Sequence, residues 1–265
     1  LLLDRHGEVI HELRVNPVGR RLDWTSLEDI SPALQEAVIR AEDKRFYRHG
    51  GVDYMAAAGA LLRGARSASF RGASTLTMQL ASLLDRRFLP VKGKRSLAQK
   101  WNQMGAAHGI EETWSKKQIL EAYLNLVTYR GELQGIAAAS RAMFGKSPHG
   151  LLQGESLILA SMIRAPNASF DDTGRRITLL AERLQWPLEA AEADLLLRKI
   201  YFGPNALEPR KALAPHAARP LLTGTWERGP VSSTLNARIQ RFAVERLKHH
   251  LPALKAQNVP EWAVL

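Results

Sequence analysis

Apolar residues recur at helical spacing along most of the chain. From Ser31 to about Lys199 they repeat every three to four positions, and no alternation typical of a strand interrupts them. This spacing predicts a mainly α block with helices at Pro32–Ala41, Tyr54–Ala65, Thr75–Asp85, Arg95–Glu112, Lys116–Asn125, Glu132–Phe144, Gly154–Ile163, Arg175–Arg183 and Leu188–Lys199.

The two ends of the chain follow a different pattern. Residues 1–30 contain short strand-like runs around a turn and are expected to form a β-type linker segment. Five prolines and several glycines interrupt regular structure between residues 204 and 230. A strand is then expected at Val231–Leu235 and a helix at Ala237–Leu251. We therefore expect a linker at 1–30, a helical domain at 31–203, and a linker with the truncated start of a second domain at 204–265.

Composition narrows the class of protein. With 265 residues, 45% of them hydrophobic, the chain can bury a substantial core. A net charge of +11 indicates an anionic partner, and without a zinc-finger or RNA-binding signature nucleic acid is disfavoured. The absence of cysteine excludes disulfides and thiolate chemistry. The sequence contains no apolar run of about 18 residues and begins with Leu1 rather than Met, so we expect that an anchor or signal has been removed.

A carboxylate pair, Glu42 and Asp43, closes the first predicted helix, and Phe46 and His49 follow within seven residues. The negative end of the helix disfavours ionisation of Glu42, whereas the basic residues that follow favour it. A carboxylate held between such opposing influences suits general-base catalysis near neutral pH. The plainer alternative is a solvated acidic pair at a helix end.

Hydroxyl groups crowd the start of a later helix. Ser74, Thr75 and Thr77 follow Gly72, and such a helix start offers N–H groups and side-chain donors to an anion. An ordinary N-cap is the alternative. Lys100 lies in a basic stretch at the next predicted helix and could hold a pyrophosphate as a point charge, although a solvated basic face explains it equally well.

Together these motifs carry a family resemblance. The pattern Glu-Asp-x-x-Phe-x-x-His-x-Gly from Glu42, followed by Gly-x-Ser-Thr-x-Thr-x-Gln from Gly72, resembles the peptidoglycan glycosyltransferases (family 51) of bifunctional class A penicillin-binding proteins. The segments Ile119–Asn125 and Leu159–Asn167 are similar to later motifs of that family. Within it, the chain is most similar to the penicillin-binding protein 1C subgroup.

The resemblance implies a lysozyme-like, mainly α fold with a large and a small lobe, and short β linker pieces at both ends. It implies polymerisation of lipid II into β-1,4 glycan with inversion at the donor sugar and departure of undecaprenyl pyrophosphate. Glu42 matches the general base. The matching substrate-binding positions are Asp43, Phe46, His49, Ser74, Thr75, Thr77, Gln79, Lys100, Arg164 and Asn167.

One position departs from the family pattern. The second catalytic carboxylate of the family falls at Gln103, and an amide cannot transfer a proton as a carboxyl group does. A leaving pyrophosphate needs little protonation, so Gln103 is expected at the catalytic site as a hydrogen-bonding group that orients the phosphates. Two alternatives remain open: a weakened or inactive lipid II-binding scaffold, and a lysozyme-like glycan hydrolase.

The resemblance also implies partners and a location. We expect lipid II, the growing glycan strand, the bacterial inner membrane surface and the inhibitor moenomycin as partners, at the periplasmic face of the membrane. No organic cofactor and no protein-held metal is expected, although a Mg²⁺ ion could bridge the substrate phosphates. The chain contains neither Ser-x-x-Lys nor Lys-Thr-Gly, so transpeptidation is not expected from it.

Overall fold

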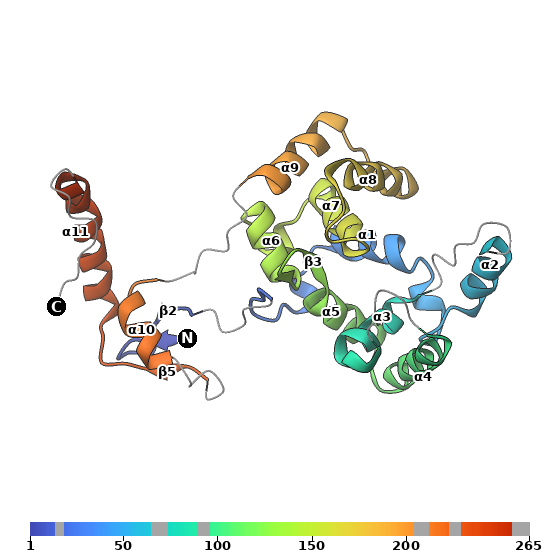
Figure 1. Ribbon diagram of the computed structural model, residues 1–265, viewed down its shortest axis with the longest axis horizontal. Helices are drawn as coiled ribbons and strands as arrows, with labels where there is room; N and C mark the ends of the chain where they lie inside the picture. Colours follow the sequence, from blue (N-terminus) through green and yellow to red (C-terminus); the bar gives the residue numbers. More distant parts are fainter. Residues whose placement is uncertain (14–18, 65–73, 89–95, 204–211, 223–228, 256–265) are drawn as a thin grey trace. The chain divides into compact units, whose positions relative to one another are not determined.

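The computed structural model describes residues 1–13, 19–64, 74–88, 96–203, 212–222 and 229–255. The chain forms two compact units, one of Leu1–Pro17 with Glu208–Leu265 and the other of Val18–Leu207. Helices dominate the described residues, which confirms the predicted mainly α fold (Figure 1). These unit boundaries differ from those expected at residues 30 and 203, because the first residues of the chain pair with its last third.

The larger unit is built around one buried helix, α7, in which every residue from Glu155 to Ile163 is buried. A helix that is apolar on all faces belongs at the centre of a domain. The helices α1 and α8 pack against α7, and α5 and α6 complete the same core. The bounds are α1 Pro32–Glu42, α5 Lys116–Leu126, α6 Ile136–Phe144, α7 Gln153–Ile163, α8 Phe170–Leu184 and α9 Ala190–Phe202.

A second group of helices in this unit comprises α2 (Tyr54–Gly64), α3 (Leu76–Leu84) and α4 (Leu97–Thr113). The helix α3 packs against both α4 and α5, so it joins this group to the main core (Figure 1). Val52, Met78 and Ala107 form a small separate apolar cluster here. Short 3₁₀ helices lie at Leu27–Asp29, Phe46–Arg48, Arg86–Phe88 and Pro148–Gly150.

The smaller unit joins the two ends of the chain. Its sheet has the order β2–β1–β5, with β1 (Leu2–Leu3) antiparallel to β2 (Val9–His11) and parallel to β5 (Val231–Ser232). Asp4 fixes this arrangement, since its carboxylate accepts hydrogen bonds from backbone N–H groups of residues 6, 8 and 237. The unit also contains α10 (Pro215–Leu222) and α11 (Ala237–Lys255).

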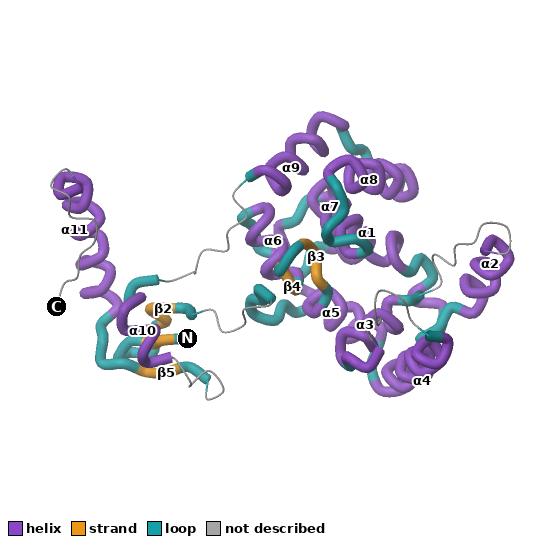
Figure 2. Tube along the Cα trace, viewed as in Figure 1, coloured by secondary structure: helices purple, strands orange, loops and turns teal. Residues whose placement is uncertain are grey.

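Three features differ from the sequence-based expectation. A hairpin of β3 (Thr128–Arg130) and β4 (Leu133–Gln134) lies between two predicted helices and replaces the first residues of the helix expected at Glu132–Phe144, because strands this short show no alternation (Figure 2). The helix α8 begins five residues earlier than predicted, at Phe170, since the hydroxyl of Ser169 caps it. The helix α10 lies in the segment expected to be a linker.

In the part of the chain that the structure describes, no helix has both the length and the apolar character that crossing a membrane requires.

The turn between α1 and α2 depends on one glycine. Gly51 has φ +88°, and a Cβ atom there would lie 2.7 Å from the backbone oxygen of Ala107 in α4. At the neighbouring Gly50 a Cβ atom would meet no atom within 4 Å. Close approach of this turn to α4 therefore requires glycine at position 51.

We expect Gly51→Ala to lower the free energy of unfolding by about 2–3 kcal/mol, because the left-handed conformation and the backbone clash both oppose a side chain. Urea denaturation followed by circular dichroism measures the change. The matched control Gly50→Ala should stay within about 0.5 kcal/mol of the parent protein. Equal stability of the two variants would contradict this account of the turn.

Candidate active site

Glu42 is the last residue of α1 and lines a cleft of about 830 Å³. The cleft lies between the C-terminal end of α1, the start of α2, the start of α3 and the end of α7. Its described lining consists of Arg40, Ala41, Glu42, Asp43, Lys44, Arg45, Asp53, Met55, Ala56, Gly59, Ser74, Thr75, Arg164 and Arg183.

One hydrogen bond holds the Glu42 carboxylate, and a second holds the amide group that donates it. Gln79 Nε2 donates to Glu42 Oε2 at 2.9 Å, and Tyr123 Oη donates to Gln79 Oε1 at 2.8 Å. Tyr123 is fully buried, so its hydroxyl fixes which end of the Gln79 amide faces Glu42. The sequence indicated Gln79 as a substrate ligand and Tyr123 only as core; the structure instead places both behind the candidate base.

Burial raises the pKa of Glu42 above its ordinary value of 4.5, and the neighbouring Asp43 adds to the effect. The hydrogen bond from Gln79 and the positive charges of Arg164 and Arg176 oppose it, lowering the pKa. The net effect of these influences is a raised pKa for the Glu42 carboxyl group, which lies at the wall of the cleft. Such a group can accept a proton from a substrate hydroxyl more readily than an exposed glutamate does.

Asp43 performs a structural task beside Glu42. Its buried carboxylate accepts a hydrogen bond from the backbone N–H of Leu76 and lies 3.0 Å from His49 Nε2. These contacts join the loop after α1 to the start of α3. Phe46, also predicted at the site, is fully buried in the core, and the Lys116 ammonium lies 4.5 Å from its ring centroid.

The start of α3 forms one wall of the cleft. Thr75 caps the helix by accepting a hydrogen bond from Met78 N, and its own hydroxyl donates to the Gly51 carbonyl at 2.5 Å. Ser74 also lines the cleft, and Lys100 Nζ donates to its hydroxyl at 2.7 Å. The structure thus brings Ser74 and Thr75 to the cleft with Lys100 behind them. Thr77 is buried instead, with its hydroxyl on Glu111 at 2.6 Å.

Gln103 is fully buried between α3 and α4 and is not among the described residues that line the cleft. Its Nε2 donates to the Met78 carbonyl at 2.6 Å and to the Ser82 hydroxyl at 2.8 Å. Its Oε1 is buried without a hydrogen-bond partner in the described part of the chain. Gln103 therefore ties two helices together in this structure rather than facing a substrate.

Of the two remaining predicted residues, one lines the cleft and the other does not. Arg164, the C-cap of α7, lies at the cleft, and its charge acts on Glu42. Asn167 lies apart from the described cleft residues, where its Oδ1 accepts a hydrogen bond from Gly131 N at 3.3 Å.

Besides Lys44 and Arg45, which belong to the basic residues that follow Glu42 in sequence, the cleft contains Arg40 and Arg183, which the sequence analysis did not single out. Arg45 is committed to Asp53, which its guanidinium contacts through two nitrogens. Arg176 acts on Glu42, and its Nη1 is buried with no hydrogen-bond partner among the described residues. Arg176 and Arg183 belong to α8, far from Glu42 in sequence, so only the fold could reveal them.

The cleft offers little to a protein-held metal ion. Asp43 and Asp53 are committed to His49 and Arg45, and within the described ranges no three His, Asp or Glu side chains cluster with metal-ligand geometry. One partly buried acid faces several basic side chains. This combination is suited to acid–base chemistry on an anionic substrate.

Comparison with known proteins identifies the class. Residues 6–190 match the transglycosylase family model, and the chain belongs to this family. It is 38% identical over 164 residues to the biosynthetic peptidoglycan transglycosylase of Mannheimia succiniciproducens, a match covering 62% of this chain and 64% of that protein.

Two longer relatives match more of this chain. It is 35% identical over 234 residues to penicillin-binding protein 1C of Escherichia coli, covering 82% of this chain and 28% of that protein. It is 30% identical over 250 residues to penicillin-binding protein 2D of Bacillus subtilis, covering 86% and 36%. The resemblance to class A penicillin-binding proteins is thereby confirmed, and the chain spans less than two thirds of the length of each of these relatives.

The raised pKa of Glu42 predicts a pH-dependent gain in stability from Glu42→Gln. Between pH 4.5 and the higher pKa of the folded state, the unfolded state has lost its Glu42 proton while the folded state still holds it, so stability falls over this range and stays at the lower level above it. The Gln variant should be more stable than the parent at pH 8, and the difference should shrink as the pH falls below 4.5. Urea titrations at several pH values measure it; the exposed change Glu112→Gln is the charge-matched control. A pH-independent difference would contradict the prediction.

We expect Gln103→Glu to lower the free energy of unfolding by about 3 kcal/mol at neutral pH, because the new carboxylate would face the Met78 carbonyl in a buried site. Asn102→Asp adds the same charge one position earlier on an exposed surface and should cost no more than about 0.5 kcal/mol. A Gln103→Glu protein of unchanged stability would contradict the buried placement.

Proposed function

We propose that this chain is a peptidoglycan glycosyltransferase domain that polymerises lipid II into β-1,4-linked glycan, with Glu42 as the general base. The observation that carries the proposal is the Glu42 carboxyl group: its pKa is raised, Gln79 holds it, and it faces a cleft rich in cations. Relatives named biosynthetic peptidoglycan transglycosylase support this substrate class.

In the proposed step the 4-hydroxyl oxygen of the acceptor sugar attacks C1 of the donor sugar from the face opposite the leaving group. The new O–C1 bond forms as the bond from C1 to the pyrophosphate oxygen breaks, so the configuration at C1 inverts. Glu42 accepts the hydroxyl proton, and undecaprenyl pyrophosphate leaves with the bonding electron pair. Gln79 and Tyr123 keep the accepting oxygen oriented.

The leaving group is the most highly charged species in this reaction. A pyrophosphate that departs gains negative charge, and pre-positioned cations around it lower the barrier. Arg164 is our first candidate for this task, and Arg40, Lys44 and Arg183 line the same cleft. Ser74, held by Lys100, can donate a hydrogen bond to a phosphate oxygen. In this proposal the basic side chains, rather than proton donation by residue 103, carry the leaving-group chemistry.

In this proposal a Mg²⁺ ion, if it takes part, would be held by the substrate phosphates rather than by side chains of the cleft. The carboxylates that line the described cleft, other than Glu42, are committed to His49, Arg45 and backbone N–H groups, so among the described residues the cleft offers few of the oxygen ligands that Mg²⁺ prefers. The proposed site of action is the periplasmic face of the bacterial inner membrane, where lipid II and the growing strand would be available. Moenomycin is the proposed inhibitor.

Two other functions make different predictions. A lysozyme-like hydrolase would also use one glutamate in a helical cleft, but it would cleave preformed glycan, and the cations beside Glu42 would have no task. A non-catalytic scaffold would bind lipid II without consuming it. The buried position of Gln103 weakens one of the two arguments for the scaffold, because that residue does not line the described cleft.

We expect Glu42→Gln to reduce lipid II polymerisation by about 10²–10⁴-fold, the range typical of a lost general base. The assay follows labelled lipid II into glycan by gel electrophoresis, with preformed glycan as a second substrate. Arg164→Ala should also lower the rate, while Arg141→Ala, an exposed change outside the described cleft, should leave it unchanged.

Polymerisation that survives Glu42→Gln would remove Glu42 from the base role. Cleavage of preformed glycan by the parent protein would favour the hydrolase. Binding of moenomycin and lipid II without any product would favour the scaffold.

A further inference from the structure

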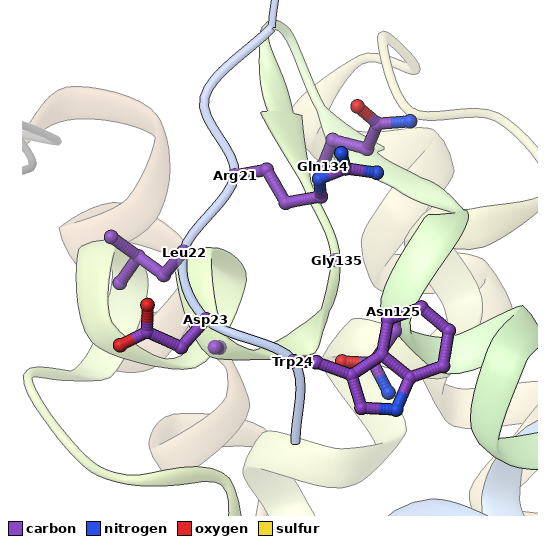
Figure 3. Close-up of a pocket in the computed structure, with 8 residues that line it drawn as sticks. Arg21, Leu22, Asp23, Trp24, Asn125, Gln134 and Gly135 are labelled. Carbon is purple, nitrogen blue, oxygen red and sulfur yellow. The ribbon is translucent and has the colours of Figure 1, made fainter. Parts of the chain in front are cut away.

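A second pocket of about 300 Å³ lies in the larger unit, and the proposed reaction does not use it (Figure 3). The segment before the first helices forms one side, and α5 with the β3–β4 hairpin and the start of α6 forms the other. Its described lining consists of Arg21, Leu22, Asp23, Trp24, Asn125, Gln134, Gly135 and Ala137, none of which lines the described cleft around Glu42. The volume is at the lower end of the range for small-molecule sites and suits a single sugar ring.

Trp24 provides a fixed, flat apolar surface here. Its side chain is 55% exposed, and its Nε1 donates to Glu121 Oε1 at 2.8 Å. The second oxygen of Glu121 accepts a hydrogen bond from Leu27 N, so the indole is attached to α5 through a carboxylate that is itself held. Because the indole N–H is used, the ring offers a ligand its face rather than a hydrogen bond.

Arg21 and Gln134 provide one donor and one acceptor. The backbone N–H of Gln134 donates to the Arg20 carbonyl, which places the two segments side by side, and the Arg21 side chain extends toward Gln134 (Figure 3). Arg21 has no hydrogen-bond partner in the described part of the chain. Gln134 Nε2 donates to the Leu126 carbonyl at 3.0 Å, so its Oε1 remains as the acceptor.

The side-chain atoms of Asn125 are already hydrogen-bonded within the protein, so this residue shapes the pocket rather than binding a ligand. Its Oδ1 accepts from Thr25 N, and its Nδ2 donates to the carbonyls of Thr25 and Glu121. Gly135 allows the start of α6 to pack against the end of α5, since its φ is +80° and a Cβ atom there would lie 2.5 Å from the Asn125 carbonyl oxygen. The polar groups that a ligand can use are therefore limited to those of the Arg21 segment and Gln134.

This pocket differs from the cleft in the net charge of its lining. Its lining contains one basic residue, Arg21, and one acidic residue, Asp23, so it carries no net charge. A phosphate or carboxylate ligand would gain little from such a lining. A neutral ligand with a flat apolar face, a hydrogen-bond acceptor and a hydrogen-bond donor matches it best.

We propose that this pocket binds an N-acetylated amino sugar. The pyranose ring would lie against the Trp24 indole, the acetamido carbonyl would accept a hydrogen bond from Arg21, and the acetamido N–H would donate to Gln134 Oε1. This inference rests on the proposed function only for the natural source of the sugar, which would be a glycan strand held outside the cleft. Binding itself is independent of turnover.

The test is an NMR titration of the ¹⁵N-labelled protein with tri-N-acetylchitotriose, following the Trp24 indole N–H resonance assigned through Trp24→Phe. We expect a saturable shift. Cellotriose has the same β-1,4 linkage but hydroxyl groups in place of the acetamido groups, and it should bind at least about tenfold more weakly. Arg21→Ala should weaken chitotriose binding about fivefold or more, whereas Arg141→Ala should not.

The same titration on Arg164→Ala separates this pocket from the cleft, because the Trp24 shift should persist there. No shift, an equal response to cellotriose, a stronger response to inorganic pyrophosphate, or loss of the shift in Arg164→Ala would each overturn the proposal. Since no step of the measurement requires polymerisation, its failure leaves the assay on lipid II unaffected, and failure of that assay leaves this one intact.

Discussion

The contact between the Asp43 carboxylate and the start of α3 governs the geometry of the cleft. Asp43 follows Glu42 directly, and its bonds to Leu76 N and His49 attach the end of α1 to the first turn of α3. Gln79, one turn into α3, then reaches back to Glu42. The candidate base is therefore oriented by the helix to which its neighbouring residue is attached. A shift of α3 would therefore move the Leu76 N–H group and the Gln79 amide together.

The hydroxyl residues at the start of α3 also connect neighbouring segments of the chain. Thr75 both caps α3 and holds the Gly51 carbonyl, while Thr77 holds Glu111 of α4. Ser74 lines the described cleft, and its hydroxyl accepts a hydrogen bond from Lys100. The motif predicted to bind an anion therefore serves mainly to connect three segments: the turn at Gly51, the start of α3, and α4. These connections place the basic side chains and Glu42 around the same cleft.

The larger unit contains two polar sites of different character. The cleft around Glu42 is rich in cations and suits a charged leaving group, whereas the pocket at Trp24 is neutral and suits an uncharged ring. Both connect to α5, through Tyr123 in the first case and Glu121 in the second. These residues are two apart in one helix and point into different surroundings. One helix consequently supports both sites without a shared ligand group.

The sequence alone determined the helical class, because this depends on local periodicity, and it indicated Glu42 as the candidate base through motifs that resemble those of a known family. The tertiary structure decided which motif residues reach the cleft: Arg164 and Ser74 do, while Thr77 and Gln103 are buried. It also supplied Arg176, Arg183 and the Tyr123 hydroxyl, and it paired the first strand of the chain with a strand after residue 230. Such choices depend on the packing of helices distant in sequence, and spacing along one helix does not specify which neighbour will cover which face.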